Sequence, residues 1–377
     1  MIPVRLWFHI GATTAVILFA IYFNRDSFLF SAKNREVAVS KIISETRLHF
    51  AVSDIPGRHQ QEREQLYQRL HWQSGKPPTH HARHRLLSAL HGFYRYEKTA
   101  MQELDTIRRR YSNVGKEQKL LVESVIGYEE KIRRTEQLIK KNDKIAQEIF
   151  DCALSFYQVE FLEFKQFTDE IESGGKSAER VSVSQALKHF VRDWAPEGGH
   201  ERMNTFPQIL ESLQKHYPNR DSRDPVQVLV PGFEVTANEW SSFMNLAYRY
   251  LTSPKVALAN STTIHPYVDW WSHQPSNAEL HRSITFPEVL VDPSSVLLVE
   301  GDFTTVFNQD SDSGRFDVIV TLFFIDTARN LLTYIETIHR LLKPGRTVRQ
   351  KEAPYGFNAR ALSKNAYWAQ FWIAVRQ

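Results

Sequence analysis

The sequence predicts an α/β fold in which a mainly parallel sheet follows an all-α region. From about residue 226 onward, short β-rich runs alternate with helical patterns, as in sheets whose strands are joined by right-handed helical crossovers. Residues 84–168 contain no proline and repeat apolar side chains at helical spacing. The chain has 377 residues, 42% of them hydrophobic, so both regions can bury a core of their own.

The N-terminal part, residues 1–25, contains the apolar run WFHIGATTAVILFAIYF at positions 7–23. Its length is at the short limit for a helix that crosses a bilayer. Because no small-residue cleavage site follows it, we predict a membrane anchor. A signal peptide and a buried hydrophobic helix remain alternatives. Arg5 and Arg25 flank the run on both sides, so its orientation stays open.

A polar linker is predicted for residues 26–80, ending in Gly75-Lys76-Pro77-Pro78. The helical region then covers residues 81–200. Its periodicity predicts three or four helices packed as a cap, followed by one more helix from Ser184 to Trp194. The charge-rich stretch 131–144 fits the solvent-facing side of a long helix.

The α/β domain covers residues 201–377. We expect its strands at residues 226–230, 233–238, 295–303, 315–326 and 369–377. Helices are expected from Ser241 to Leu251 and from Thr327 to Leu342, the second ending at Lys343-Pro344-Gly345.

The composition argues against nucleic-acid binding and excludes an internal disulfide. The formal net charge of +4 is small and lacks the concentrated basic patch of a nucleic-acid binder. The single cysteine, Cys152, excludes an internal disulfide.

Three acidic residues stand at the ends of predicted strands: Glu239, Asp302 and Asp326. Each of them alone would most simply be a helix cap or a turn residue. Three acids at successive strand ends indicate a ligand site, because ligands of open α/β sheets bind beyond the carboxyl ends of the strands. An acid after the second strand suits the two hydroxyls of a ribose, since a carboxylate accepts both hydrogen bonds.

The connection between the first two predicted strands is unusually short. Only seven positions separate Gly232 from Glu239, whereas a helical crossover needs at least about a dozen residues. We therefore expect no parallel pairing here. The chain would instead form a Pro-Gly hairpin or leave one segment outside the sheet.

Several of these segments resemble the carnosine N-methyltransferase family. They are Asn238-Glu239-Trp240-Ser241, Gly301-Asp302-Phe303 and FFIDTARNLLTYIETIHRLLKPG at 323–345. The resemblance extends over about residues 84–345 and the last strand. It implies a Rossmann-like class I methyltransferase domain with S-adenosyl-L-methionine as cofactor. The acceptor would be the imidazole of carnosine or a similar histidine-containing dipeptide.

The resemblance also assigns site residues. The implied cofactor-binding residues are Arg192, Gly232, Glu239, Asp302 and Phe303. Glu239 corresponds to the ribose acid, and Asp302 with Phe303 to residues around the adenine. Asp326 corresponds to the catalytic carboxylate that holds the acceptor imidazole. His189 stands where the family has a glutamine that accompanies the arginine at 192.

The chain departs from the family pattern in two places. The glycine-rich loop of the form GAGLGRL and its helix are missing before Glu239, and a substrate-contacting block is missing after Gly345. A catalytically impaired, membrane-tethered scaffold or a truncated gene product is therefore the alternative to an active methyltransferase. The expected partners are the dipeptide, a membrane through residues 7–23 and a second copy in a homodimer, but not nucleic acid. With the anchor the catalytic domain would be cytosolic, and without it the protein would be cytoplasmic.

Overall fold

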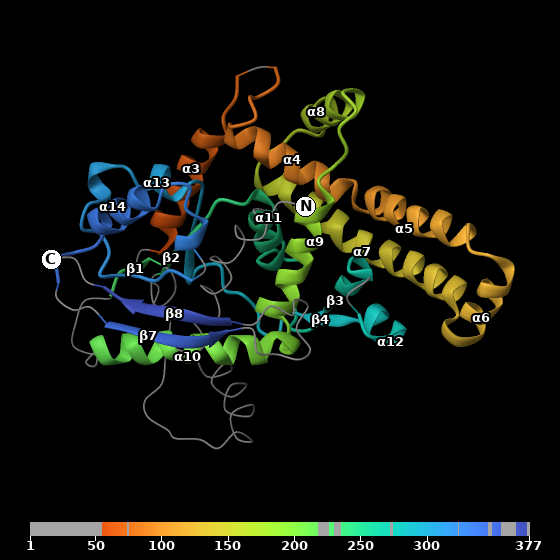
Figure 1. The fold of residues 1–377 in the computed structure, drawn as a ribbon. Coiled ribbons are helices and arrows are strands. Elements are labelled where there is room, and N and C mark those ends of the chain that lie inside the picture. The colour runs from red at the N-terminus through yellow and green to blue at the C-terminus, as the bar shows by residue number, and fades with distance from the viewer. Residues whose placement is uncertain are drawn as a thin grey trace.

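The computed structural model describes residues 55–73, 75–217, 226–229, 235–271, 274–322, 324–345, 349–355 and 367–374. Within these ranges a helical region precedes and flanks a small parallel sheet, so the α/β class is confirmed (Figure 1). The apolar run at 7–23 and Gly232 lie outside the described residues. Among the described helices, none is long and apolar enough to cross a bilayer.

The helical region contains more helices than predicted. Between residues 82 and 173 the described chain forms five: α4 (Ala82–Tyr94), α5 (Tyr96–Ser112), α6 (Lys116–Ile126), α7 (Tyr128–Phe156) and α8 (Phe161–Ser173). The expected number of three or four was wrong because the breaks take few residues. Arg95 alone separates α4 from α5, and Gly127 turns the chain between α6 and α7 with a positive φ of 62°. The charge-rich stretch 131–144 lies within α7.

Part of the segment expected to be a polar linker forms helix α3 (Ile55–Leu70). Its Leu66 and Leu70 are buried, and the helix packs against strand β5 (Val296–Glu300). Arg58 Nη2 also donates to Thr236 Oγ1 at 3.4 Å. Helix α3 is therefore part of the packing of the α/β domain, although it precedes the helical region in the sequence.

The helix predicted from Ser184 to Trp194 is confirmed. It consists of α9 (Arg180–His189) and a π-helical continuation, η2 (Phe190–Trp194). A short 3-10 turn, η3 (Pro196–Gly198), leads into the long helix α10 (Gly199–His216). This chain of helices joins the helical region to the sheet.

The main sheet has four described strands in the order β5-β2-β1-β6, all parallel. They are β1 (Val228–Leu229), β2 (Val235–Glu239), β5 and β6 (Val318–Ile319). In chain order these are the first, second, third and fourth described strands of this sheet. The spatial order 3-2-1-4 is that of the Rossmann fold around its topological switch point.

The parallel pairing of β1 with β2 contradicts the expectation for the short connection. Leu229 pairs with Thr236, so the last residue of β1 lies beside the second residue of β2. A crossover helix is needed when the chain must return along a full strand. Here only two residues of β1 are in the ladder, so the chain has to return over a very short distance.

The other predicted elements of the domain are mostly present, with shorter strands. Helix α11 (Ser242–Leu251) and strand β8 (Tyr367–Ile373) confirm two of them. The long strand expected at 315–326 is reduced to β6, followed by a 3-10 turn, η8 (Ile325–Thr327). Helix α14 (Leu331–Leu341) begins later than expected because the side chain of Asn330 accepts a bond from Leu332 N and caps it.

Two antiparallel hairpins accompany the sheet. Strand β3 (Thr262–Ile264) pairs with β4 (Ile284–Phe286), with a 3-10 turn, η5 (Pro266–Asp269), and α12 (Asn277–His281) between them. Strand β7 (Arg349–Tyr355) pairs with β8 in a separate sheet that contacts α10.

The sheet separates two apolar layers. Ala237, Val296 and Leu298 pack with the helical region, α3 and α11. Leu297 and Val299 face the opposite layer, which contains Phe303 of helix α13 (Phe303–Val306), Phe307 just after it, and the inner side of α14. Since side chains alternate along a strand, the carboxylates at the ends of β2 and β5 point toward the helical region.

Candidate active site

The carboxyl edge of the sheet brings together the three acids singled out in the sequence. Glu239 ends β2, Asp302 follows β5, and Asp326 lies in η8 after β6. The first two come from paired strands, because Glu239 pairs with Glu300 in the ladder and Gly301 N, next to Asp302 in the chain, donates to Glu239 O at 2.9 Å. The three acids therefore follow the carboxyl ends of the strands, the side on which open α/β sheets bind ligands.

Glu239 is held at its position by the start of helix α11. Its Oε1 accepts a hydrogen bond from Ser241 N at 2.7 Å, and Asn245 Nδ2 reaches its backbone oxygen at 3.4 Å. The residue is only 4% exposed. The carboxylate predicted to bind a ribose is therefore anchored and nearly covered.

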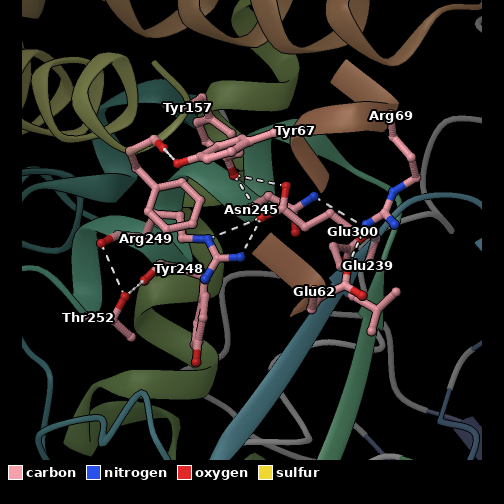
Figure 2. A network of polar contacts seen from close by, with 12 residues as sticks. Glu62, Tyr67, Arg69, Tyr157, Glu239, Asn245, Tyr248, Arg249, Thr252 and Glu300 are labelled. Carbon is pink, nitrogen blue, oxygen red and sulfur yellow. Dashed lines mark hydrogen bonds and ion pairs between the residues drawn. The ribbon is translucent and has the colours of Figure 1, made fainter. Parts of the chain in front are cut away.

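The neighbouring acid, Glu300, was missed by the sequence reasoning. It accepts hydrogen bonds from Tyr157 Oη at 2.9 Å and from Arg249 Nη2 at 2.7 Å (Figure 2). Burial and the Glu300 charge raise the pKa of Tyr157 well above its usual value, so the phenol stays protonated and donates a hydrogen bond to the carboxylate. The only available signal was the acid that closes the apolar run SVLLVE before Gly301.

Helix α3 brings one acidic and one basic side chain close to Glu239 and Glu300 (Figure 2). Glu62 forms an ion pair with Arg69, seven residues later in the helix. Burial raises the pKa of Glu62, Arg69 opposes this shift, and the charge of nearby Glu300 adds a smaller upward effect. Figure 2 draws the pair together with Glu239 and Glu300. Helix α3 thus contributes charged groups to this end of the sheet, which the linker interpretation did not foresee.

Asp302 acts as the N-cap of helix α13. Its Oδ1 accepts from Thr304 N at 2.9 Å and from Thr304 Oγ1 at 2.6 Å. The next residue, Phe303, is 4% exposed and packs against the rings of Phe324 and Tyr334 at centroid distances of 5.1 and 5.6 Å. The cap interpretation therefore holds for Asp302, and Phe303 belongs to an aromatic cluster just behind the edge.

Asp326 and its surroundings are more open. The side chain is exposed in the turn η8. Among the described residues, its carboxylate forms no hydrogen bond or ion pair, in contrast to Glu239, Glu300 and Asp302. An uncommitted carboxylate at the edge of the sheet can accept a hydrogen bond from a ligand.

Arg192 lies in η2, in a compact cluster with two neighbours. Its Nε donates to Asp193 Oδ1 at 2.8 Å, and its Nη2 lies 2.9 Å from His189 Nδ1. The same histidine nitrogen is 2.7 Å from Asp193 Oδ2. Burial, together with the positive charge of Arg192, lowers the pKa of His189 to about 4, so this imidazole is neutral at pH 7.

The predicted site residues therefore lie in different parts of the structure. The sheet brings Glu239, Asp302, Phe303 and Asp326 to one edge, and Arg192 sits in its own helical cluster with His189. Gly232 lies outside the described residues. In the described ranges, no group of histidines, cysteines and acids is arranged to hold a metal ion.

Known proteins match the chain over this same region. The family model described as carnosine N-methyltransferase matches residues 172–351, which include η2 and all three acidic strand ends. The carnosine N-methyltransferase of Schizosaccharomyces pombe is 28% identical over 284 residues, covering 69% of this chain and 74% of that protein.

Two further relatives carry the same name. The carnosine N-methyltransferase of Mus musculus is 29% identical over 279 residues, covering 67% of this chain and 66% of its own length. That of Dictyostelium discoideum is 32% identical over 192 residues, 44% of this chain and 40% of the relative. The family match agrees with the sheet order and with the acids at the strand ends. The family model and these relatives therefore support the carnosine N-methyltransferase family, a family of methyltransferase enzymes, for this chain.

Proposed function

We propose that the protein is an S-adenosylmethionine-dependent N-methyltransferase that methylates the imidazole of a histidine-containing dipeptide such as carnosine. The observation that carries the proposal is the placement of Glu239, Asp302 and Asp326 after the carboxyl ends of three strands of one parallel sheet, within the matched region. One edge then offers acceptors for a nucleoside and, beside them, a carboxylate for the methyl acceptor.

The residues at the edge fit the nucleoside half of the cofactor. Glu239, anchored by the Ser241 amide, is the ribose acceptor, and Asp302 with Phe303 stands next to it on the adenine side. For the methionyl half of the cofactor, the sequence offers fewer candidate binding residues. Residues 230–234 leave no room for a glycine loop and a helix between Leu229 and Val235. Arg192 is the residue that the proposal assigns to the cofactor carboxylate.

The reaction needs alignment more than acid–base help. When bound, the cofactor supplies a methyl group on a sulfonium, which a neutral nitrogen lone pair can attack. An imidazole is largely neutral at pH 7, since its unperturbed pKa is about 6.5. Asp326 accepts a hydrogen bond from one ring nitrogen and so fixes the tautomer whose other nitrogen carries the lone pair. The same carboxylate stabilises the positive charge that develops on the ring.

Calorimetry on the purified, folded chain tests the proposal, with S-adenosylmethionine as the titrant. We expect binding, and a Glu239→Gln variant should bind about ten- to hundredfold more weakly because it loses charge-assisted hydrogen bonds to the ribose. The matched control is Glu170→Gln on the outer side of α8, where the exposed carboxylate pairs with Lys76. A folded wild-type chain that binds no S-adenosylmethionine at millimolar concentration contradicts the proposal.

Methyl transfer is the second readout. Mass spectrometry of carnosine incubated with the protein and S-adenosylmethionine should show a gain of one methyl group on the imidazole. The scaffold alternative predicts binding of a partner without methylated product, so the same assay separates the two.

A further inference from the structure

Two arginines converge on one indole ring at the carboxyl edge of the sheet. Arg85 comes from α4 and places its Cζ 5.3 Å from the ring centroid of Trp240. Arg329, in the segment between η8 and α14, places its Cζ 5.9 Å from the same ring. Trp240 directly follows Glu239. The helical region and the fourth strand's loop thus both deliver a guanidinium to the site.

The guanidinium of Arg85 has a buried hydrogen-bond donor without an acceptor among the described residues. Its Nη1 donates to the backbone oxygen of His80 at 2.6 Å, but its Nε is buried and has no hydrogen-bond partner in the described structure. Burial lowers the pKa of Arg85, and the nearby Asp302 raises it. Asp302 already uses Oδ1 for the cap of α13. A buried guanidinium N–H without an acceptor favours an anion next to it.

Arg329 stands three residues after Asp326. Both side chains are exposed, and neither forms a hydrogen bond or ion pair within the described part of the chain. The loop therefore presents one negative and one positive group that do not neutralise each other. Two guanidinium groups therefore lie over the Trp240 ring, one from α4 and one from the loop after β6, and the charge of Asp302 acts on Arg85.

A histidine dipeptide with a free carboxyl terminus carries the complementary pattern. The imidazole and the carboxylate belong to the same residue, so an acid for the ring and a cation for the carboxylate must lie close together. Guanidinium groups bind carboxylates through paired hydrogen bonds and also pack flat against aromatic rings.

We infer that Arg329, together with Arg85 across the Trp240 ring, binds the carboxylate of the acceptor and makes the site selective for dipeptides with a free carboxyl-terminal histidine. The inference rests on the proposed function, because it concerns the acceptor of that reaction. It adds to it a second anchoring point, one that the assignment of Asp326 does not supply.

The experiment compares carnosine with β-alanylhistamine, which has the same imidazole and amide but lacks the carboxylate. Wild-type protein should prefer carnosine in kcat/KM by about ten- to hundredfold, the effect of a hydrogen bond to a charged group. Arg329→Gln should raise KM for carnosine toward that for β-alanylhistamine and leave kcat within about twofold. Arg329→Lys, which keeps the charge, should retain part of the preference.

A second readout and a control separate this role from a structural one. Calorimetry should show weaker carnosine binding by Arg329→Gln, with β-alanylhistamine binding unchanged. Arg133→Gln is the matched control, since Arg133 forms an exposed ion pair with Glu130 on α7. Thermal unfolding of the three variants shows whether each is folded.

The outcomes are distinguishable. A folded wild-type protein that methylates neither compound overturns the proposed function and this inference with it. Equal kcat/KM for the two acceptors overturns the inference and leaves the proposed function standing. A rise in KM for S-adenosylmethionine in Arg329→Gln, with carnosine unaffected, would assign the arginine to the cofactor and also overturn it.

Discussion

Glu239 and Glu300 occupy paired positions at the carboxyl ends of β2 and β5, yet they are held by different partners. Glu239 is fixed by a backbone amide at the start of α11, whereas Glu300 is neutralised by Arg249 and hydrogen-bonded by Tyr157. Two carboxylates at adjacent strand positions repel each other unless one charge is compensated. The pairing of Glu300 with Arg249 therefore compensates one of the two charges, beside the carboxylate that we propose for the ribose, Glu239.

Removing Arg249 should strongly destabilise the fold. An Arg249→Met variant leaves Glu300 buried beside Glu239 without its cation, which costs about 3–5 kcal/mol in comparable buried pairs. Urea unfolding followed by circular dichroism measures the free energy of unfolding. The exposed pair of Arg133 and Glu130 supplies the control, because Arg133→Met should change stability by less than about 1 kcal/mol. Equal losses in both variants would contradict the special role of Arg249.

Helix α3 should behave as part of the core. Leu66 is 4% exposed and belongs to the same apolar cluster as Ala237 and Leu298 of the sheet. Leu66→Ala should therefore lower the free energy of unfolding by about 2–5 kcal/mol. Leu162→Ala on α8 is matched in chemistry, and its side chain is 66% exposed, so we expect about 0.5 kcal/mol or less. If both variants unfold at the same urea concentration, α3 is a peripheral segment.

The sequence predicted the order of elements in the domain because alternating apolar runs and helical periodicity depend on local spacing. It did not predict α3, since that helix is strongly polar and its few buried leucines are interpretable only with the sheet in place. The parallel pairing of β1 was rejected on a rule that assumes full-length strands. The two-residue length of β1 depends on tertiary packing, which no local pattern reveals.

The site was predictable where a motif carried it and not where partners come from distant segments. Asp302 and Asp326 were found because each follows an apolar run. The roles of Arg85 and Tyr157 depend on contacts across more than a hundred residues, to Trp240 or to Glu300. Such contacts leave no periodic or spacing signal in a single sequence.

His189 should make stability depend on pH between about 6.5 and 4. In the unfolded chain a histidine has a pKa of about 6.5, whereas burial and Arg192 lower the pKa of His189 to about 4. The unfolded state then binds more protons in this window, so its contribution is complete above pH 6.5 and is lost as pH falls toward 4. The loss is on the order of 2–3 kcal/mol.

A His189→Gln variant isolates that contribution. The amide can still bond to Asp193 and Arg192 but does not titrate. Its free energy of unfolding should therefore fall less steeply than that of the wild type between pH 6.5 and 4. His80→Gln, at an exposed position before α4, should leave the wild-type slope unchanged. Parallel profiles for wild type and His189→Gln would show that the imidazole is protonated in the folded state as well.

Asp326 should affect the rate of methyl transfer and hardly affect the cofactor. Its carboxylate is exposed and has no hydrogen-bond or ion-pair partner within the described ranges, so Asp326→Asn removes a charge without breaking a contact of the fold. The variant loses the stabilisation of the imidazolium that forms as the methyl group is transferred. We expect kcat with carnosine to fall by about 10²–10³-fold, the effect of removing one preorganised group from a charged transition state.

The matched control for Asp326→Asn is Asp310→Asn, an exposed acid in the 3-10 turn η7 (Asp310–Asp312). Calorimetry with S-adenosylmethionine should give the same dissociation constant for both variants and the wild type, because Asp326 is assigned to the acceptor only. A kcat within about twofold of wild type in Asp326→Asn would remove this residue from the mechanism. An interaction that is equally strong in the ground state and the transition state does not raise kcat. A parallel loss of cofactor binding would instead place Asp326 in the nucleotide site, beside Glu239 and Asp302.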